Sequence, residues 1–153
     1  MLKIGIAADH AGFLEKESLR EKLETGPYEL IDYGAYAVDP EDDYPDVVTP
    51  LAKALSDGEI QKGIAICGSG VGVSIAANKF KGVRAALITE GYSARQGVEH
   101  DDMNLICLGA RVIGSELIFE LTTTFLDAQF DKEERFRRRL NKVLALEENS
   151  RKA

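Results

Sequence analysis

The sequence contains few cysteines, no long apolar run and a deficit of positive charge. Its two cysteines, Cys67 and Cys107, cannot form the disulfide framework of a small secreted protein. The 19 Lys and Arg residues are outnumbered by 26 Asp and Glu residues, and the net charge of −7 argues against a nucleic-acid partner or an anionic membrane. No apolar run approaches the length of a membrane span. The opening segment, MLKIGIAADH, turns polar after eight residues, unlike a signal peptide, and we expect a cytoplasmic protein.

Short apolar runs alternate with amphipathic segments along the 153 residues, without a repeat or a linker. This length and pattern predict a single domain over residues 1–153. The runs predict strands at 3–8, 28–34, 62–67, 83–88 and 104–109. The amphipathic segments predict helices at 13–24, 44–55 (where Pro50 would kink the helix or shift its start), directly after Gly72, at 92–99, after Gly114 and at about 133–149.

The alternation of strands and helices predicts a five-stranded parallel sheet with helices on both faces. In such sheets, ligands bind beyond the carboxyl ends of the strands. Polar residues follow the predicted strands at these ends, and we expect them to share one edge of the sheet. They are Asp9 and His10, Cys67 with the glycines behind it, Glu90, and Arg111.

The segment ICGSGVG, from Ile66 to Gly72, delivers a thiol into a glycine-rich loop. A dinucleotide fingerprint and a cysteine phosphatase loop both fail at Val73, where the former needs glycine and the latter arginine. No Gly-Lys-Ser/Thr follows, which excludes a Walker loop. Two interpretations remain, a tight turn with a packing cysteine and an anion cradle of backbone N–H groups that favours the thiolate.

A thiolate beside an oxyanion cradle suits either acyl transfer or proton abstraction next to a carbonyl. Both histidines, His10 and His100, are candidate partners and leave the two schemes open. Arg135 and Arg139 lie four residues apart, on one face of the last predicted helix. With Arg111 they would clamp a phosphate, and the alternative is a solvated basic face. We expect Cys107 in the core, and the acidic segment VDPEDDYPD as a solvated loop and not a metal site.

The segments AADHAG, DYPD, ICGSGVGVSIAANK, GVRAAL and GARVIG, with the spaced arginines, resemble the ribose-5-phosphate isomerase B family. That family also includes the galactose-6-phosphate and allose-6-phosphate isomerases. The resemblance covers nearly the whole chain, in order. It implies a three-layer α/β/α Rossmann-like fold and the interconversion of aldose and ketose phosphates in the pentose phosphate pathway. It further implies that no metal or other cofactor is used, and that a homodimer or a dimer of dimers builds its site from two chains.

The same resemblance assigns roles to residues. Cys67 matches the proton-transferring base, His100 the residue that opens the sugar ring, and Ser69 a hydroxyl that stabilises the enediolate. The positions that match substrate-binding residues are Asp9, His10, Tyr44, Gly68, Ser69, Gly70, Val71, Gly72, Asp101, Arg111, Arg135 and Arg139.

Asp101 departs from the family pattern, which has asparagine there. An ionised carboxylate cannot donate a hydrogen bond to a sugar oxygen and would repel an enediolate. Either Asp101 turns away, or the substrate is not ribose 5-phosphate. Galactose 6-phosphate or allose 6-phosphate are the alternatives within the class. A non-catalytic sugar-phosphate-binding subunit and a nucleotide-binding module are the alternatives outside it.

Overall fold

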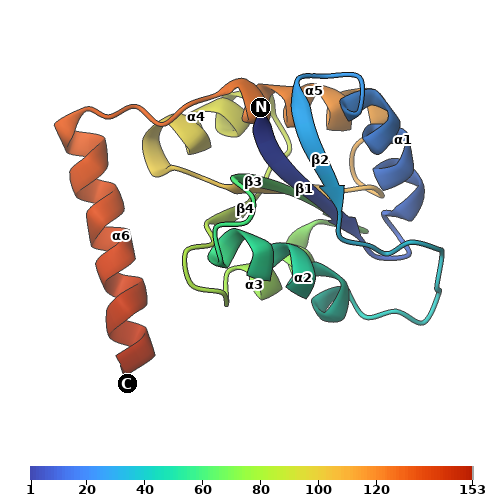
Figure 1. The fold of residues 1–153 in the computed structure, drawn as a ribbon, viewed down its shortest axis with the longest axis horizontal. Helices are drawn as coiled ribbons and strands as arrows, with labels where there is room; N and C mark the ends of the chain where they lie inside the picture. The colour runs from blue at the N-terminus through green and yellow to red at the C-terminus, as the bar shows by residue number, and fades with distance from the viewer. Residues whose placement is uncertain (153) are drawn as a thin grey trace.

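The computed structural model describes residues 1–152, which form alternating strands and helices (Figure 1). The elements are β1 (Leu2–Ala8), α1 (Phe13–Leu23), β2 (Tyr28–Asp32), α2 (Tyr44–Ser56), β3 (Lys62–Cys67), α3 (Val71–Ala77), β4 (Ala85–Leu87), α4 (Gly91–Asp101), β5 (Leu105–Gly109), α5 (Ser115–Asp127) and α6 (Glu134–Lys152). Every predicted strand is present, and α2 starts at Tyr44 as predicted and continues through Pro50. No helix within residues 1–152 combines the length and apolarity of a bilayer span.

The five strands form one parallel sheet in the order β2-β1-β3-β5-β4. Helices α1, α4 and α5 cover one face and α2 and α3 the other, so the predicted three-layer α/β/α fold is confirmed (Figure 1). Alternate residues of β3 enter opposite cores: Ile64 and Ile66 face the first group of helices, and Ala65 and Cys67 the second. Burial on both faces explains why the strands are continuous apolar runs.

The connections out of β1 create a switch point in the sheet. The chain passes from β1 to β2 on one side and later returns to β3 on the other. A crevice opens beyond the carboxyl ends of two such strands. Asp9 and His10 follow β1, and Cys67 ends β3. Cys67 is in register with Gly109 of β5, which brings the following Arg111 to the same edge.

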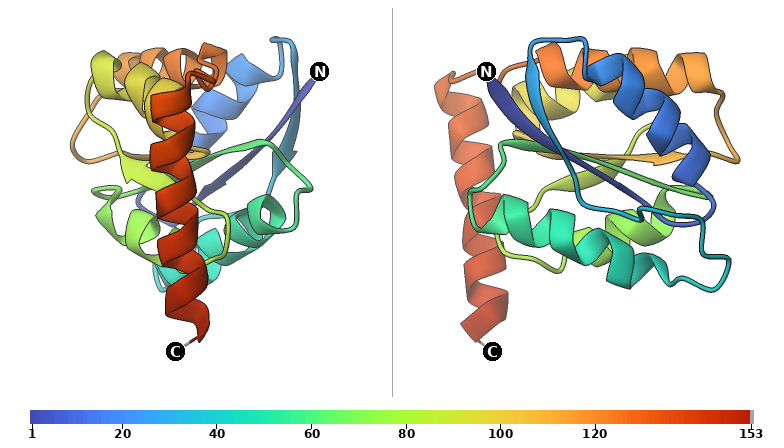
Figure 2. Two further views of the ribbon diagram at one scale, coloured as in Figure 1. Left: turned by 90° about the vertical axis from the view of Figure 1, so that its left-hand side faces the viewer. Right: turned by 45° about the vertical axis from the view of Figure 1, so that its right-hand side comes forward.

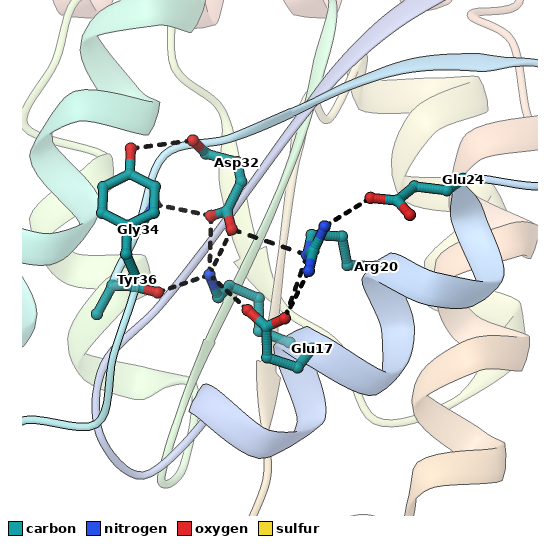
Figure 3. Close-up of polar contacts among 8 residues, drawn as sticks. Glu17, Arg20, Glu24, Asp32, Gly34 and Tyr36 are labelled. Carbon is teal, nitrogen blue, oxygen red and sulfur yellow. Dashed lines mark hydrogen bonds and ion pairs between the residues drawn. The ribbon is translucent and has the colours of Figure 1, made fainter.

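A buried polar network fixes the loop that leaves β2 (Figure 3). Lys16 on α1 is fully buried, and its Nζ donates to Oδ1 and Oδ2 of Asp32, both at 2.8 Å, and to the carbonyl of Ala35 at 2.6 Å. The Gly34 N–H donates to Asp32 Oδ1 at 2.9 Å. The Ala35 N–H donates to the carbonyl of Ala8, at the end of β1. The loop that leads toward α2 is therefore anchored beside the switch point.

Helix α6 crosses the layers at the β4 end of the sheet (Figures 1 and 2). Its apolar side chains are divided: Phe136 is buried, whereas Val143 and Leu144 are 49% and 38% exposed. Near its carboxyl end, Glu147 accepts the N–H of Gly82 at 2.9 Å. A cleft of about 980 Å³ separates the carboxyl-terminal half of α6 from β4 and α4.

Candidate active site

A pocket of about 460 Å³ lies at the switch point. The structure brings four of the five predicted strand-end residues into it, whereas Glu90 lies elsewhere. Glu90 caps α4 by accepting the Ser93 N–H at 2.9 Å, and these hydrogen bonds lower the pKa of its carboxyl. Glu90 follows a strand end as expected, but its carboxylate has a structural role and does not line this pocket. The pocket is lined by Asp9, His10, Ala11, Tyr44, Cys67, Gly68, Ser69, Gly72, Arg111 and Val112.

Cys67 presents its sulfur at the junction of β3 and the glycine loop. The residue is 5% exposed and lines the pocket, and its Sγ accepts the Gly70 N–H at 3.1 Å. Gly70 has a φ of +84°, and a Cβ there would lie 2.7 Å from Leu87 Cδ1. Glycine is thus needed both for the turn and for the packing. By contrast, Cys107 is fully buried, and burial raises the pKa of its thiol, in keeping with its predicted place in the core.

Two loop glycines border side chains of the pocket, and Gly72 makes room for one of them. A Cβ on Gly72 would lie 2.8 Å from the ring of Tyr44, and one on Gly68 would lie 3.6 Å from Nη1 of Arg111. The Arg111 N–H donates to the Gly68 carbonyl at 2.9 Å. A guanidinium and a phenol therefore border the thiol-bearing loop. A bound phosphate or oxyanion would meet both the cation and the backbone N–H groups.

Acidic residues stand beside His10. Asp9 is buried, and its Oδ1 accepts the N–H groups of Ala11 and Gly12 at 3.0 and 3.2 Å. Asp42 accepts a hydrogen bond from Nδ1 of His10 at 2.7 Å. One potential ligand atom from each of Asp9, His10 and Asp42 lies within 4.8 Å of the other two, which is close enough to coordinate one cation. Because these hydrogen bonds occupy Oδ1 of both acids, we interpret the group as a hydrogen-bonded cluster and not as metal ligands.

Three further predicted side chains, those of His100, Arg135 and Arg139, form a second cluster where α4 meets α6. The His100 imidazole stacks on the Phe136 ring, with centroids 4.0 Å apart and planes 12° from parallel. Its Nδ1 lies 3.0 Å from Gln96 Nε2. Arg135 and Arg139 lie over the same Phe136 ring, 4.5 and 5.9 Å from its centroid. The two arginines lie on one face of α6, as their spacing predicted, and His100 packs against the same Phe136 ring.

The two clusters lie at opposite ends of the strands, one beyond the carboxyl ends and the other beyond the amino ends. Cys67 is in register with Gly109, at the carboxyl end of β5, whereas α4 and His100 precede Leu105, at the amino end of that strand. Four residues of strand separate the two ends, which is about 13 Å. A single chain thus does not bring all the predicted site residues together.

A family profile described as Ribose/Galactose Isomerase matches residues 4–143. The chain belongs to the ribose/galactose isomerase family. This confirms the resemblance found in the sequence, together with the α/β fold that it implied.

Three proteins illustrate how similar the chain is to individual sugar phosphate isomerases. It is 39% identical over 148 residues to ribose-5-phosphate isomerase B of Escherichia coli, which covers 97% of this chain and 98% of the relative. It is 40% identical over 131 residues to D-erythrulose-4-phosphate isomerase of Pectobacterium atrosepticum, with 86% of each chain covered. The crystal structure of ribose-5-phosphate isomerase B from Mycoplasma genitalium with bound ribulose-5-phosphate matches with a TM-score of 0.90 and 37% identity, over 96% of this chain and 97% of that one.

Two side chains that contact the candidate histidines of this isomerase had no signal in the sequence. Asp42 lies in the acidic segment that was expected to be solvated, and Phe136 lies in the helix predicted at about 133–149 without a predicted role. A pairing between residues 10 and 42 has no local signal, because the loop after β2 brings the two together only in the folded chain. The stacking of His100 on Phe136 likewise depends on where α6 docks.

Proposed function

We propose that this isomerase interconverts ribose 5-phosphate and ribulose 5-phosphate through a cis-enediolate, with Cys67 as the base. The observation that carries the proposal is the position of the Cys67 sulfur, in a pocket that also holds a backbone N–H loop and a guanidinium. The names of the Escherichia coli and Mycoplasma genitalium relatives support the choice of sugar. The direct test is the interconversion of the two pentose phosphates by the purified protein. We further propose a cytoplasmic, single-domain enzyme of the pentose phosphate pathway.

The chemistry moves a proton between C2 and C1 of the open-chain sugar. The Cys67 thiolate takes the proton from one carbon and returns it to the other, and a hydroxyl proton passes between O2 and O1, while negative charge develops on the enediolate oxygens. The N–H groups of the loop and the Ser69 hydroxyl stabilise that charge only as it forms, which is what accelerates the step. Ser69 Oγ accepts the Val71 N–H at 3.2 Å, so its own hydrogen is available to a substrate oxygen.

We propose that the site is completed by a second copy of the chain, which supplies His100, Arg135 and Arg139. The opposite placement of the two clusters requires this if all of them act on one small substrate. The apolar side chains near the β4 edge and on α6 support it, because they are exposed in a single chain. They are Val71, Ile75, Leu87, Tyr92, Val143, Leu144 and Leu146. A homodimer, or a dimer of dimers, would cover this surface while α6 reaches the partner.

In the completed site, residues of the two clusters would divide the work between ring opening and phosphate binding. His100 would donate a proton to the ring oxygen and accept one from the anomeric hydroxyl, which opens the furanose before isomerisation. The arginines and His10 would hold the phosphate, which is unchanged by the reaction. The phosphate thereby fixes the reacting carbons against the Cys67 sulfur.

The replacement Arg139→Ala is expected to raise KM for ribose 5-phosphate by about 10- to 100-fold with little change in kcat, since it removes a charge-assisted contact to a group that does not react. Steady-state kinetics measure the two constants. Arg138→Ala is the matched control, because Arg138 lies on the same helix, pairs with Glu134 at 2.6 Å and is not over the Phe136 ring. A loss confined to kcat would contradict the anchoring role.

A different sugar phosphate is the second candidate, favoured by Asp101 and by the Pectobacterium relative. Asp101 is exposed at the end of α4, and it lines the cleft beside α6, next to His100 in the chain. If ribose 5-phosphate is the substrate, Asp101→Asn is expected to change kcat/KM for it by less than about threefold, as for a surface substitution. A panel of four-, five- and six-carbon sugar phosphates measures this. A large gain on ribose 5-phosphate, with a loss on another sugar, would instead assign the other sugar.

A further inference from the structure

Asp42 makes two hydrogen bonds to His10 through a single oxygen. Oδ1 of Asp42 accepts from Nδ1 of the imidazole at 2.7 Å and from the backbone N–H of His10 at 3.1 Å. The side chain of Asp42 is 11% exposed and that of His10 is 33% exposed. The contact is thus shielded on the acid side and open on the pocket side. Surface ion pairs between mobile side chains lack both the shielding and the second, backbone bond.

The loop that carries Asp42 is held at both ends. Its start is tied to β1 by the hydrogen bonds between Ala8, Gly34 and Ala35, and its end runs into the first turn of α2. Within the described residues, Oδ2 of Asp42 is buried and has no hydrogen-bond partner. The charge of the carboxylate is therefore compensated mainly through Oδ1, by His10. An isolated buried carboxylate is costly, so this pairing favours a charged imidazole.

The direction of the hydrogen bond determines which proton His10 carries. A carboxylate only accepts, so Nδ1 holds a proton and Nε2 is the free nitrogen. In the neutral imidazole, Nε2 would be an acceptor and would repel a phosphate oxygen. Only the imidazolium can donate from Nε2 to an anion, and His10 therefore needs its second proton to bind phosphate.

We propose that Asp42 is a positioning residue for the substrate's phosphate: it orients the imidazole of His10 and keeps it in the doubly protonated form that donates to the anion. This inference rests on the proposed function for the identity of the anion, but the pairing of the two side chains can be tested without it. The assignment was not made from the sequence, because Asp42 is one of five acids in a loop that was expected to be solvated.

The charged groups around His10 act in both directions. The hydrogen bond to Asp42 is the largest influence and raises the pKa of His10, and the charge of Asp9 raises it further. Partial burial and the charge of Arg111 lower it. Cys67 and Tyr44 are the other titratable residues of the pocket. Since the raised pKa belongs to the phosphate-binding cation, phosphate affinity is expected to persist to a higher pH than an unpaired histidine would allow, and to fall as the pH rises through that pKa.

The test compares Asp42→Asn with Glu41→Gln. Both remove one negative charge from the same loop, but Glu41 is exposed and its side chain makes no hydrogen bond or ion pair within residues 1–152. The amide that Asp42→Asn introduces would keep an acceptor for the His10 N–H groups without the charge. Proton NMR follows the imidazole titration directly, because the chain has only two histidines and a His100→Asn background leaves His10 alone. Steady-state kinetics with ribose 5-phosphate from pH 6 to 9 give KM and kcat.

We expect Asp42→Asn to move the His10 titration to lower pH and Glu41→Gln to leave it in place. Above both titration midpoints, KM should rise by about tenfold for each pH unit of that displacement, with kcat unchanged, and the difference should shrink toward pH 6. The direction of the change in KM distinguishes loss of the His10 pairing from a general effect of charge. Loss of a negative charge near a phosphate site would by itself lower KM, and Glu41→Gln measures that general effect.

An unmoved His10 titration in Asp42→Asn would overturn the proposal, and so would a KM that changes in parallel in the two variants. Asp42→Ala, which removes the acceptor as well, should raise KM further and across the whole pH range, and a normal KM in this variant would overturn the orienting role. If the protein does not convert ribose 5-phosphate at all, the proposed function fails on the assay alone. The NMR comparison then still decides whether Asp42 controls His10.

Discussion

Replacing Cys67 with alanine is expected to lower kcat by about 10³-fold or more while the protein remains folded, since the loss of a general base costs about 10²–10⁴-fold. Within residues 1–152, the Cys67 thiol is the candidate base in the pocket that the loop N–H groups also face. Val73, in the first turn of α3, has an apolar side chain that cannot act as a base in its place. The change removes one sulfur atom from a side chain that borders the pocket, so the effect on packing is expected to be small. Turnover of ribose 5-phosphate and a thermal unfolding curve measure the two properties.

Cys107→Ala is the matched control for this variant. It also removes a sulfur from a buried strand, but Cys107 is fully buried and outside the pocket. It should therefore lose some stability and keep its kcat. Cys67→Ala should still bind inorganic phosphate, because His10 and Arg111 are intact. If Cys67→Ala retained activity, or lost it together with its fold, the thiol would not be established as the base.

The fold was predictable because its strands are buried on both faces. Such strands appear in the sequence as continuous apolar runs, and β3 was predicted with the bounds that the structure has. The edge strand β4 is shorter than the predicted 83–88. The N–H of Arg84 donates to the side chain of Asn104 and not to a neighbouring strand. The ends of an edge strand depend on such side-chain contacts, which an apolar pattern does not encode.

The site was predictable only in the part that follows from topology. Residues after β1, β3 and β5 had to meet at one edge of a parallel sheet, and His10, Cys67 and Arg111 do so. Glu90 also follows a strand, but its carboxylate is used at the first turn of α4. His100 was associated with Cys67 by the resemblance alone, since no rule of chain geometry brings the end of α4 to that edge. The partner of His10 was missed because loop conformations are not encoded in periodicity.

Two inactive variants are expected to restore activity when they are combined in one dimer. Cys67→Ala and His100→Asn should each be inactive as homodimers, because each lacks one of the two proposed catalytic groups. In a heterodimer of the two, one site joins the intact Cys67 of one chain to the intact His100 of the other, and the second site carries both defects. Co-expression with two affinity tags isolates this heterodimer. Its activity should be about half that of the native dimer, since one of two sites is complete.

The alternative is a site formed within one chain, for which each chain of the heterodimer carries one defect and the activity stays at the level of the homodimers. The geometry favours restoration. Reaching Cys67 within its own chain would require His100 to leave Phe136 and cross about 13 Å of strand. A heterodimer of Cys67→Ala and Ser69→Ala is the matched control, because both residues belong to the same loop and every site of that heterodimer then carries one defective loop. Recovery in the first pair and none in the control would mean that the sulfur and the imidazole reach the same sugar from different chains.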